Sequence, residues 1–147
     1  MNDDSKEFLR LLNSNGTEYV VIGAHALALH GYTRNTEDID VWIGRSPANV
    51  ERLAKTLDEF GTPFPEGGRE AFMSEQNRMV RLGVPPNRID ILNFAARIPF
   101  EEVWDRRLQA DLDGVTVFFI SREDFIKSKR DAGRHKDLGD LEALGEL

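Results

Sequence analysis

The segment Asp38-Ile39-Asp40-Val41-Trp42-Ile43 alternates between two sets of side chains along its whole length. A repeat of two residues is the pattern of a β-strand, because successive side chains point to opposite faces of a sheet. We therefore expect the branched aliphatic residues of this segment to point into the core. The two aspartates and Trp42 are expected to share the opposite face, where the indole either stacks on a bound base or packs under a helix.

Two carboxylates on one face of a strand form an unusual electrostatic arrangement. Asp38 and Asp40 are two residues apart, so their Cα atoms lie about 7 Å apart. Like charges at this separation repel and raise each other's pKa unless a cation neutralises them. Oxygen ligands suit a hard divalent ion such as Mg²⁺, which also accepts water and substrate phosphates as ligands. The alternative interpretation is a solvated strand face that happens to carry two acids.

A third carboxylate occupies the same kind of position in the segment 88–93. Ile89 and Ile91 are expected to point inward and Asp90 outward, by the same alternation. Neighbouring strands lie about 5 Å apart, so Asp90 joins Asp38 and Asp40 if the two strands are near neighbours in register. Three carboxylates could then hold two metal ions about 3.5–4 Å apart, the arrangement used for in-line phosphoryl transfer.

The whole pattern predicts one α/β domain over residues 1–147, with a mixed β-sheet of about five strands flanked by helices. The predicted strands are 18–22, 38–43, 79–82, 88–93 and 115–120, and residues 62–75 are expected to form a loop. The predicted helices are 5–13, 24–30, 47–60, 100–108, 121–131 and 136–147. The helices within 121–147 are expected to pack on the domain, and the last one to turn Leu138, Leu141 and Leu144 inward.

Composition excludes several classes of protein. The chain has 147 residues, a formal net charge of −7 and no cysteine, which excludes disulfides, thiolate catalysis and cysteine-ligated zinc. No segment approaches the roughly 18 apolar residues of a membrane span, and the acidic N-terminus lacks the pattern of a secretion signal. We therefore expect a cytoplasmic protein with no membrane partner. Basic residues gather in 121–136, which favours a small anionic ligand or a short contact with RNA over a broad duplex-binding face.

The segment Val20-Val21-Ile22-Gly23-Ala24 predicts a strand that runs through a small-residue turn into a helix. A helix N-terminus presents free backbone N–H groups and the positive end of the helix dipole, which together suit a phosphate. Glycine allows the backbone to approach a ligand closely. Strand–turn–helix units of this kind also occur in purely structural roles.

Together these segments resemble the DNA polymerase beta-like nucleotidyltransferase superfamily. Its pattern is a hydrophobic strand ending in Gly-Gly or Gly-Ser, then a helix, then Asp-x-Asp or Asp-x-Glu on the next strand and a third carboxylate further on. Gly23-Ala24, Asp38-Ile39-Asp40 and Asp90 are the matching residues here. The stretches 29–40 and 129–141 are similar to the small bacterial branch related to abortive-infection (type IV toxin) nucleotidyltransferases, and the likeness covers about residues 19–144.

The resemblance implies a metal-dependent enzyme that moves an NMP group from an NTP such as ATP to an acceptor hydroxyl. Asp38, Asp40 and Asp90 would be the catalytic residues and the ligands of Mg²⁺ or Mn²⁺, and Asp90 would also act on the attacking hydroxyl. The expected nucleotide-binding residues are Gly23, Ala24, Arg34, Thr36, Lys129 and Lys136. The acceptor would be RNA, a partner protein or a small molecule, and the toxin branch implies a cognate antitoxin.

Ala24 departs from the superfamily pattern, which has Gly or Ser at this position. A serine would offer its hydroxyl to the phosphates, whereas Ala24 offers only its backbone N–H. This difference favours an alternative function, a catalytically weak or inactive module of the same fold that binds a nucleotide or a protein partner. Arg34 can bind phosphate through its planar guanidinium or be a solvated loop residue, and Thr36 can be a turn residue. Asp137 and Asp140 are expected to pair with nearby basic residues or to cap the last helix.

Overall fold

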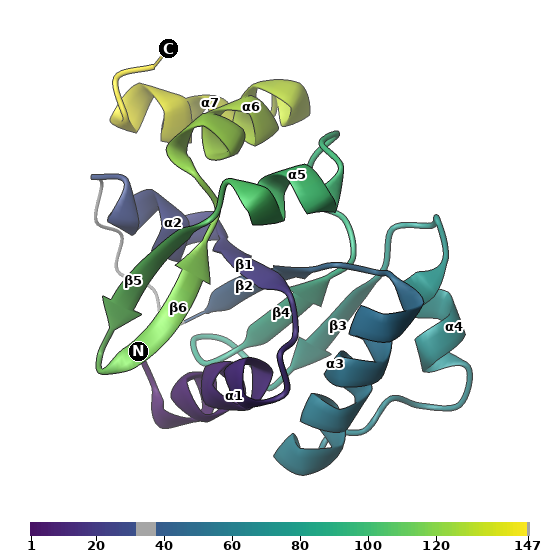
Figure 1. Cartoon of the computed structure of the whole chain (residues 1–147). Coiled ribbons are helices and arrows are strands. Elements are labelled where there is room, and N and C mark those ends of the chain that lie inside the picture. Colours follow the sequence, from purple (N-terminus) through teal and green to yellow (C-terminus); the bar gives the residue numbers. More distant parts are fainter. Residues whose placement is uncertain (32–37, 147) are drawn as a thin grey trace.

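The computed structural model describes residues 1–31 and 38–146, in which one β-sheet carries helices on both sides (Figure 1). The strands are β1 (Tyr19–Ile22), β2 (Ile39–Ile43), β3 (Met79–Leu82), β4 (Ile89–Leu92), β5 (Leu108–Leu112) and β6 (Val115–Phe119). The helices are α1 (Asp3–Ser14), α2 (Gly23–Leu29), α3 (Pro47–Phe60), α4 (Gly68–Met73), α5 (Phe100–Asp105), α6 (Arg122–Ala132) and α7 (His135–Ala143). The predicted mixed α/β fold is confirmed, with six strands in the described part of the chain rather than about five.

The sheet has the strand order β3-β4-β2-β1-β6-β5. Two hairpins, β3–β4 and β5–β6, form its edges with antiparallel pairing. In the middle, β2 is antiparallel to β1 and parallel to β4, and β1 is parallel to β6. This order places the two aspartate-bearing strands, β2 and β4, side by side.

Helix boundaries follow capping residues that are visible in the sequence. Ser46 accepts a hydrogen bond from the backbone N–H of Asn49 at the start of α3, and Pro47 occupies the first turn. Ser121 accepts in the same way from the backbone N–H of Asp124 at the start of α6. Gly133 ends α6 in the left-handed region, so α6 and α7 become two helices joined by a tight connection. These two helices lie together at the C-terminal end of the molecule (Figure 1).

The core lies on the sheet and under the helices. Ile39, Val41 and Ile43 are fully buried, as the alternation of β2 predicts. Trp42 is also buried and meets Phe100 edge-on, with ring centroids 5.5 Å apart, so the indole packs against α5 instead of facing a ligand. Helices α1 and α3 pack side by side (Figure 1). Among the described residues no helix combines the length and apolar character needed to span a membrane.

Two predicted elements and one predicted side-chain orientation were wrong. The helix expected over 100–108 ends at Asp105, and the next residues form β5, which turns back through Asp113 and Gly114, both at positive φ. An Asp-Gly pair is a favoured two-residue hairpin turn, and it outweighs the weak helical pattern. The loop expected over 62–75 contains α4, which buries Phe72. In α7, Leu141 is buried as expected, but Leu138 is 37% exposed.

Candidate active site

The aspartates meet where β2 and β4 run in parallel. Asp40 lies directly opposite Asp90 in the register of the two strands, and Asp38 immediately precedes β2. On its other side Asp40 is opposite Ile22, the last residue of β1 before α2. The structure therefore places Asp40 beside Asp90 on neighbouring strands with Asp38 just before β2, while their role as metal ligands and catalytic residues stays a prediction.

A cavity of about 410 Å³ opens over these carboxylates. Its walls come from the β1–α2 junction, the aspartate strands, the β3–β4 hairpin and the C-terminal helices. The lining residues are Gly23, Ala24, Asp38, Asp40, Arg81, Arg88, Asp90, Lys129, Lys136 and Asp140. Segments distant in sequence thus bring acids and bases to one hollow.

Asp40 is the carboxyl most affected by this environment. Burial raises its pKa, and the negative charge of Asp90 and a hydrogen bond between the two carboxyls raise it further. The positive charges of Lys136 and Arg88 act in the opposite direction. The net result is a pKa of about 6 for Asp40. A carboxyl that titrates near neutrality beside a second carboxyl is a frequent feature of functional sites.

Gly23 is required at its position by Asp40. Its φ is +70°, which L-residues with a side chain rarely adopt. A Cβ atom built on Gly23 would also overlap the carboxylate of Asp40, the nearest neighbour in that direction. The glycine was predicted to allow close approach of a phosphate, and the structure shows close approach of an aspartate. Ala24 follows it in α2 and lines the same cavity.

Two arginines stand among the aspartates, and the sequence interpretation missed both. The backbone N–H of Arg88 donates to Asp38 Oδ1 at 2.8 Å, and its Nη2 lies 3.8 Å from Asp38 Oδ2. Arg88 Nε lies 3.0 Å from Asp90 Oδ1, and Arg81 Nε lies 3.5 Å from the same oxygen. The available signal was the alternation of β4, since Arg88 is two residues before Asp90 and shares its face.

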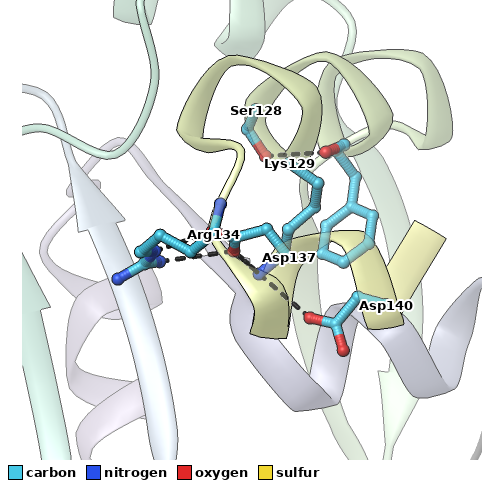
Figure 2. Close-up of polar contacts among 6 residues, drawn as sticks. Ser128, Lys129, Arg134, Asp137 and Asp140 are labelled. Atoms are coloured by element: carbon cyan, nitrogen blue, oxygen red, sulfur yellow. Dashed lines mark hydrogen bonds and ion pairs between the residues drawn. The ribbon is translucent and has the colours of Figure 1, made fainter.

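The two candidate lysines differ in their partners. Lys129 Nζ lies 3.2 Å from Asp137 Oδ1 and 3.1 Å from Asp140 Oδ2, and its side chain is 12% exposed (Figure 2). Arg134 Nε donates to Asp137 Oδ2 at 2.6 Å. Burial raises the pKa of Asp137, but the hydrogen bonds from Arg134 and Lys129 outweigh burial and lower that pKa below its usual value. Asp137 and Asp140 therefore pair with basic residues as expected, and Lys129 ties α6 to α7.

Lys136 is the lysine that bears on the aspartates. Its side chain is exposed, it lines the cavity over the carboxylates, and its charge lowers the pKa of Asp40. The positions of Arg34 and Thr36, the other two predicted nucleotide-binding residues in this region, lie outside the described residues.

A second hollow of about 280 Å³ adjoins the first and shares Gly23, Asp40, Lys129 and Lys136 with it. Its remaining walls are largely apolar and include Phe94 and Phe125. A charged hollow that adjoins an apolar one has the polarity of a phosphorylated ligand with a hydrophobic ring.

The chemistry of the donors fits a hard divalent cation. All three candidate ligands are carboxylates, and a cation between Asp40 and Asp90 would relieve the repulsion that raises the pKa of Asp40. In the structure, arginine nitrogens lie against two of these acids, Asp38 and Asp90. Consistently, no group of three or more His, Asp or Glu side chains within residues 1–31 and 38–146 is gathered closely enough to hold a metal ion.

Comparison with known proteins places the chain in a family. No curated protein matches it. The model of one protein family, described as "nucleotidyltransferase of unknown function (DUF6036)", matches residues 4–145, so the match spans nearly all of the sequence. The chain therefore belongs to this family of nucleotidyltransferases of unknown function.

Proposed function

We propose that this protein is a divalent-metal-dependent nucleotidyltransferase that moves an NMP group from an NTP to an acceptor hydroxyl. The observation that carries the proposal is the pairing of Asp40 with Asp90 across two parallel strands, in a chain of a nucleotidyltransferase family. Larger hollows exist, such as one of about 610 Å³ beside Trp104 and Phe118. None of the described residues that line that hollow carries a carboxylate, the group that this chemistry needs.

In this proposal Asp38, Asp40 and Asp90 hold Mg²⁺ or Mn²⁺. The bound ion would supply a Lewis acid that neutralises charge on the phosphates. Asp40 must be ionised to act as a ligand, and its pKa of about 6 means that it is largely ionised at neutral pH. Lys136 would bind a phosphate oxygen of the NTP, because its exposed ammonium faces the same cavity as the carboxylates.

The proposed reaction is a single nucleophilic substitution at the α-phosphorus of the NTP. The acceptor oxygen forms a bond to the α-phosphorus of the NTP, and the bond from that phosphorus to the α,β-bridging oxygen breaks. Pyrophosphate leaves with the electron pair of the broken bond. The proton of the acceptor hydroxyl passes to the carboxylate of Asp90, which acts as general base. Asp90 is suited to this role because it lies beside Asp40 and lines the same cavity.

The acceptor is proposed as a class, a hydroxyl of RNA, of a protein or of a small molecule. The resemblance to the abortive-infection branch implies a toxin role. No described residue favours that role, or favours one of these acceptors over another. A second candidate function is a module that binds a nucleotide or partner without turnover. Ala24 favours it, and so do the ion pairs of Arg88 with Asp38 and Asp90, which already neutralise the acids.

The test measures metal-dependent nucleotide binding. ATP, GTP, CTP and UTP are titrated calorimetrically with and without Mg²⁺ into wild type and into Asp40→Asn/Asp90→Asn, which keeps the shape of both side chains. Asp58→Asn, an exposed substitution in α3, is the matched control. We expect metal-dependent binding in wild type and control and none in the double variant. Metal-independent binding, equal in all three proteins, would contradict the enzyme and support the binding module.

A further inference from the structure

We infer that Arg88 is a positioning residue that holds Asp38 and Asp90 together in the metal-free protein and competes with a divalent cation for their carboxylates. Binding of an NTP would draw the guanidinium away and make the carboxylates available, so that metal and nucleotide bind together. This inference rests on the proposed function and names how the same site is regulated.

Arg88 is placed between the two strands by its backbone as well as its side chain. Its N–H donates to Asp38 Oδ1, and its carbonyl accepts from the N–H of Ile39 at 3.0 Å. The guanidinium then reaches both Asp38 and Asp90, at 3.8 and 3.0 Å. One side chain thus contacts a carboxylate on each of the two metal-binding strands, a position that a cation ligated by both acids would contest.

The contact with Asp90 has the character of an exchangeable ion pair. Arg88 Nε and Asp90 Oδ1 are close, yet within the described part of the chain neither atom has a hydrogen-bond partner of acceptable geometry. Directional, charge-assisted hydrogen bonds are the strong form of an arginine–carboxylate contact, and this pair lacks that alignment. The attraction is therefore mainly between charges, and an ion of higher charge can replace the guanidinium.

Burial explains why Asp90 needs a cationic partner at all times. Its side chain is 5% exposed, and an ionised carboxylate at that depth is costly unless it is paired. Without the Arg88 guanidinium, the remaining ion pair of Asp90 with a described residue is the one with Arg81, which is 0.5 Å more distant and 56% exposed. A site that has lost Arg88 should consequently recruit a metal ion more strongly when no nucleotide is present.

The same guanidinium faces a nucleotide site. Arg88 lines the cavity that Lys136 and Ala24 also line, and its side chain is 26% exposed, so an anionic ligand in the cavity can reach it. Phosphates bind arginine through the same planar donors that carboxylates use. A triphosphate can therefore bind the Arg88 guanidinium in place of the carboxylates when those carboxylates bind a metal ion.

The test is Mn²⁺ binding followed by the electron paramagnetic resonance of free Mn²⁺, with and without the non-transferable analogue α,β-methylene-ATP. The variants are Arg88→Gln, which removes the charge and keeps the backbone contacts, and Arg88→Lys, which keeps the charge but not the planar fork. Arg81→Gln is the comparison variant, because it removes the longer and more exposed of the two arginine contacts with Asp90. In the absence of nucleotide we expect Arg88→Gln to bind Mn²⁺ at least about tenfold more tightly than wild type, Arg88→Lys to lie between them and Arg81→Gln to change less than about threefold.

The analogue should strengthen Mn²⁺ binding to wild type and Arg81→Gln, and much less to Arg88→Gln. Unchanged or weaker nucleotide-free Mn²⁺ binding in Arg88→Gln would overturn the inference, as would equal effects of the two arginines. If Arg88→Gln does not fold, Arg88→Lys gives the same decision on a smaller scale. The variant Asp40→Asn distinguishes failure of the Arg88 inference from failure of the proposed function. If Asp40→Asn binds Mn²⁺ and the analogue like wild type, the proposed function fails, whatever the arginine variants show.

Discussion

Asp40 and Asp90 lie opposite each other on adjacent parallel strands, and their proximity helps to raise the pKa of Asp40 to about 6. Both acids are needed in the ionised form for the proposed chemistry, so the pair links the acidity of the site to its affinity for cations. The two aspartates are fifty positions apart in the sequence, and the parallel pairing of β2 with β4 brings them together.

Metal affinity should therefore depend on pH through Asp40. Below pH 6 the carboxyl holds a proton that a metal ion must displace, so the Kd for Mn²⁺ should rise up to about tenfold per pH unit between pH 6 and pH 5. Above pH 7 the Kd should level off. Mn²⁺ titrations from pH 5 to 8 test this expectation, and Asp40→Asn should lose the inflection near pH 6. An inflection that persists in that variant would assign the proton to another group.

Stability should show the opposite dependence on pH. Burial and the charge of Asp90 raise the folded-state pKa of Asp40 above its ordinary value of 3.8, so the folded protein holds the proton more tightly than the unfolded chain. The contribution of Asp40 to stability is thus present at low pH and is lost as pH rises from about 4 to about 6. Asp40→Asn should raise the free energy of unfolding by about 1–2 kcal/mol at pH 8 and change it little at pH 4. Urea denaturation at the two pH values measures this difference, and equal effects at both would contradict it.

Gly23→Ala should be more harmful than an ordinary substitution of a glycine at positive φ. Gly16 has nearly the same backbone angle, with φ of +66° against +70°, but an added Cβ there meets nothing within 4 Å. Gly16→Ala should lower the free energy of unfolding by about 1 kcal/mol from backbone strain alone. Gly23→Ala should cost about 1–2 kcal/mol more, because Asp40 must move, and should also weaken Mn²⁺ binding. An equal decrease in the free energy of unfolding of the two variants would show that the Asp40 side chain moves aside at no cost.

Lys129 should stabilise the protein more than it binds nucleotide. Lys129→Met leaves Asp137 and Asp140 buried with reduced compensation, which should lower the free energy of unfolding by about 3 kcal/mol. Lys127→Met removes an exposed pair with Asp131 at 3.9 Å and should cost less than about 0.5 kcal/mol. Thermal unfolding of the two variants compares them. If Lys129→Met changes the stability little but loses ATP binding, Lys129 would instead be a ligand-binding residue.

Lys136→Gln should act on the aspartates and leave stability nearly unchanged. Removal of its charge should raise the pKa of Asp40 above about 6, because Lys136 is the largest of the influences that lower it. Carbon-13 NMR of the aspartate carboxyls follows that pKa directly. The same variant should bind ATP with Mg²⁺ about tenfold more weakly. An unchanged pKa together with unchanged binding would remove Lys136 from the site.

Local patterns allowed the strands of the site to be predicted, but not the contacts across them. The alternation around Asp40 and Asp90 was sufficient to place both opposite the neighbouring isoleucines, since the period of a strand is two, but it did not predict that Asp90 is buried. The pairing of β2 with β4 depends on the whole sheet and had to be assumed. The contacts of Arg88 depend on side-chain conformation, which no spacing rule gives.

The missed strand has a different cause. All five residues of β5 are exposed or half-buried, so the strand has no clear apolar alternation, and only the Asp113-Gly114 turn marked it. In the last predicted helix the three leucines were all expected to point inward, although Leu138, in the first half of α7, is exposed. Amphipathic patterns are weak at sheet edges, where fewer neighbours cover each residue.

The space beside Gly23 couples two positions in evolution. Because the carboxylate of Asp40 fills the space that a side chain at position 23 would need, position 23 cannot gain a side chain while Asp40 keeps its place. A descendant that acquires alanine or a larger residue at 23 must displace or shorten the acid at 40, and so loses or moves a proposed metal ligand in the same step. A relative with a side chain at position 23 should accordingly lack the aspartate at 40, and such a lineage would keep the fold after abandoning the reaction.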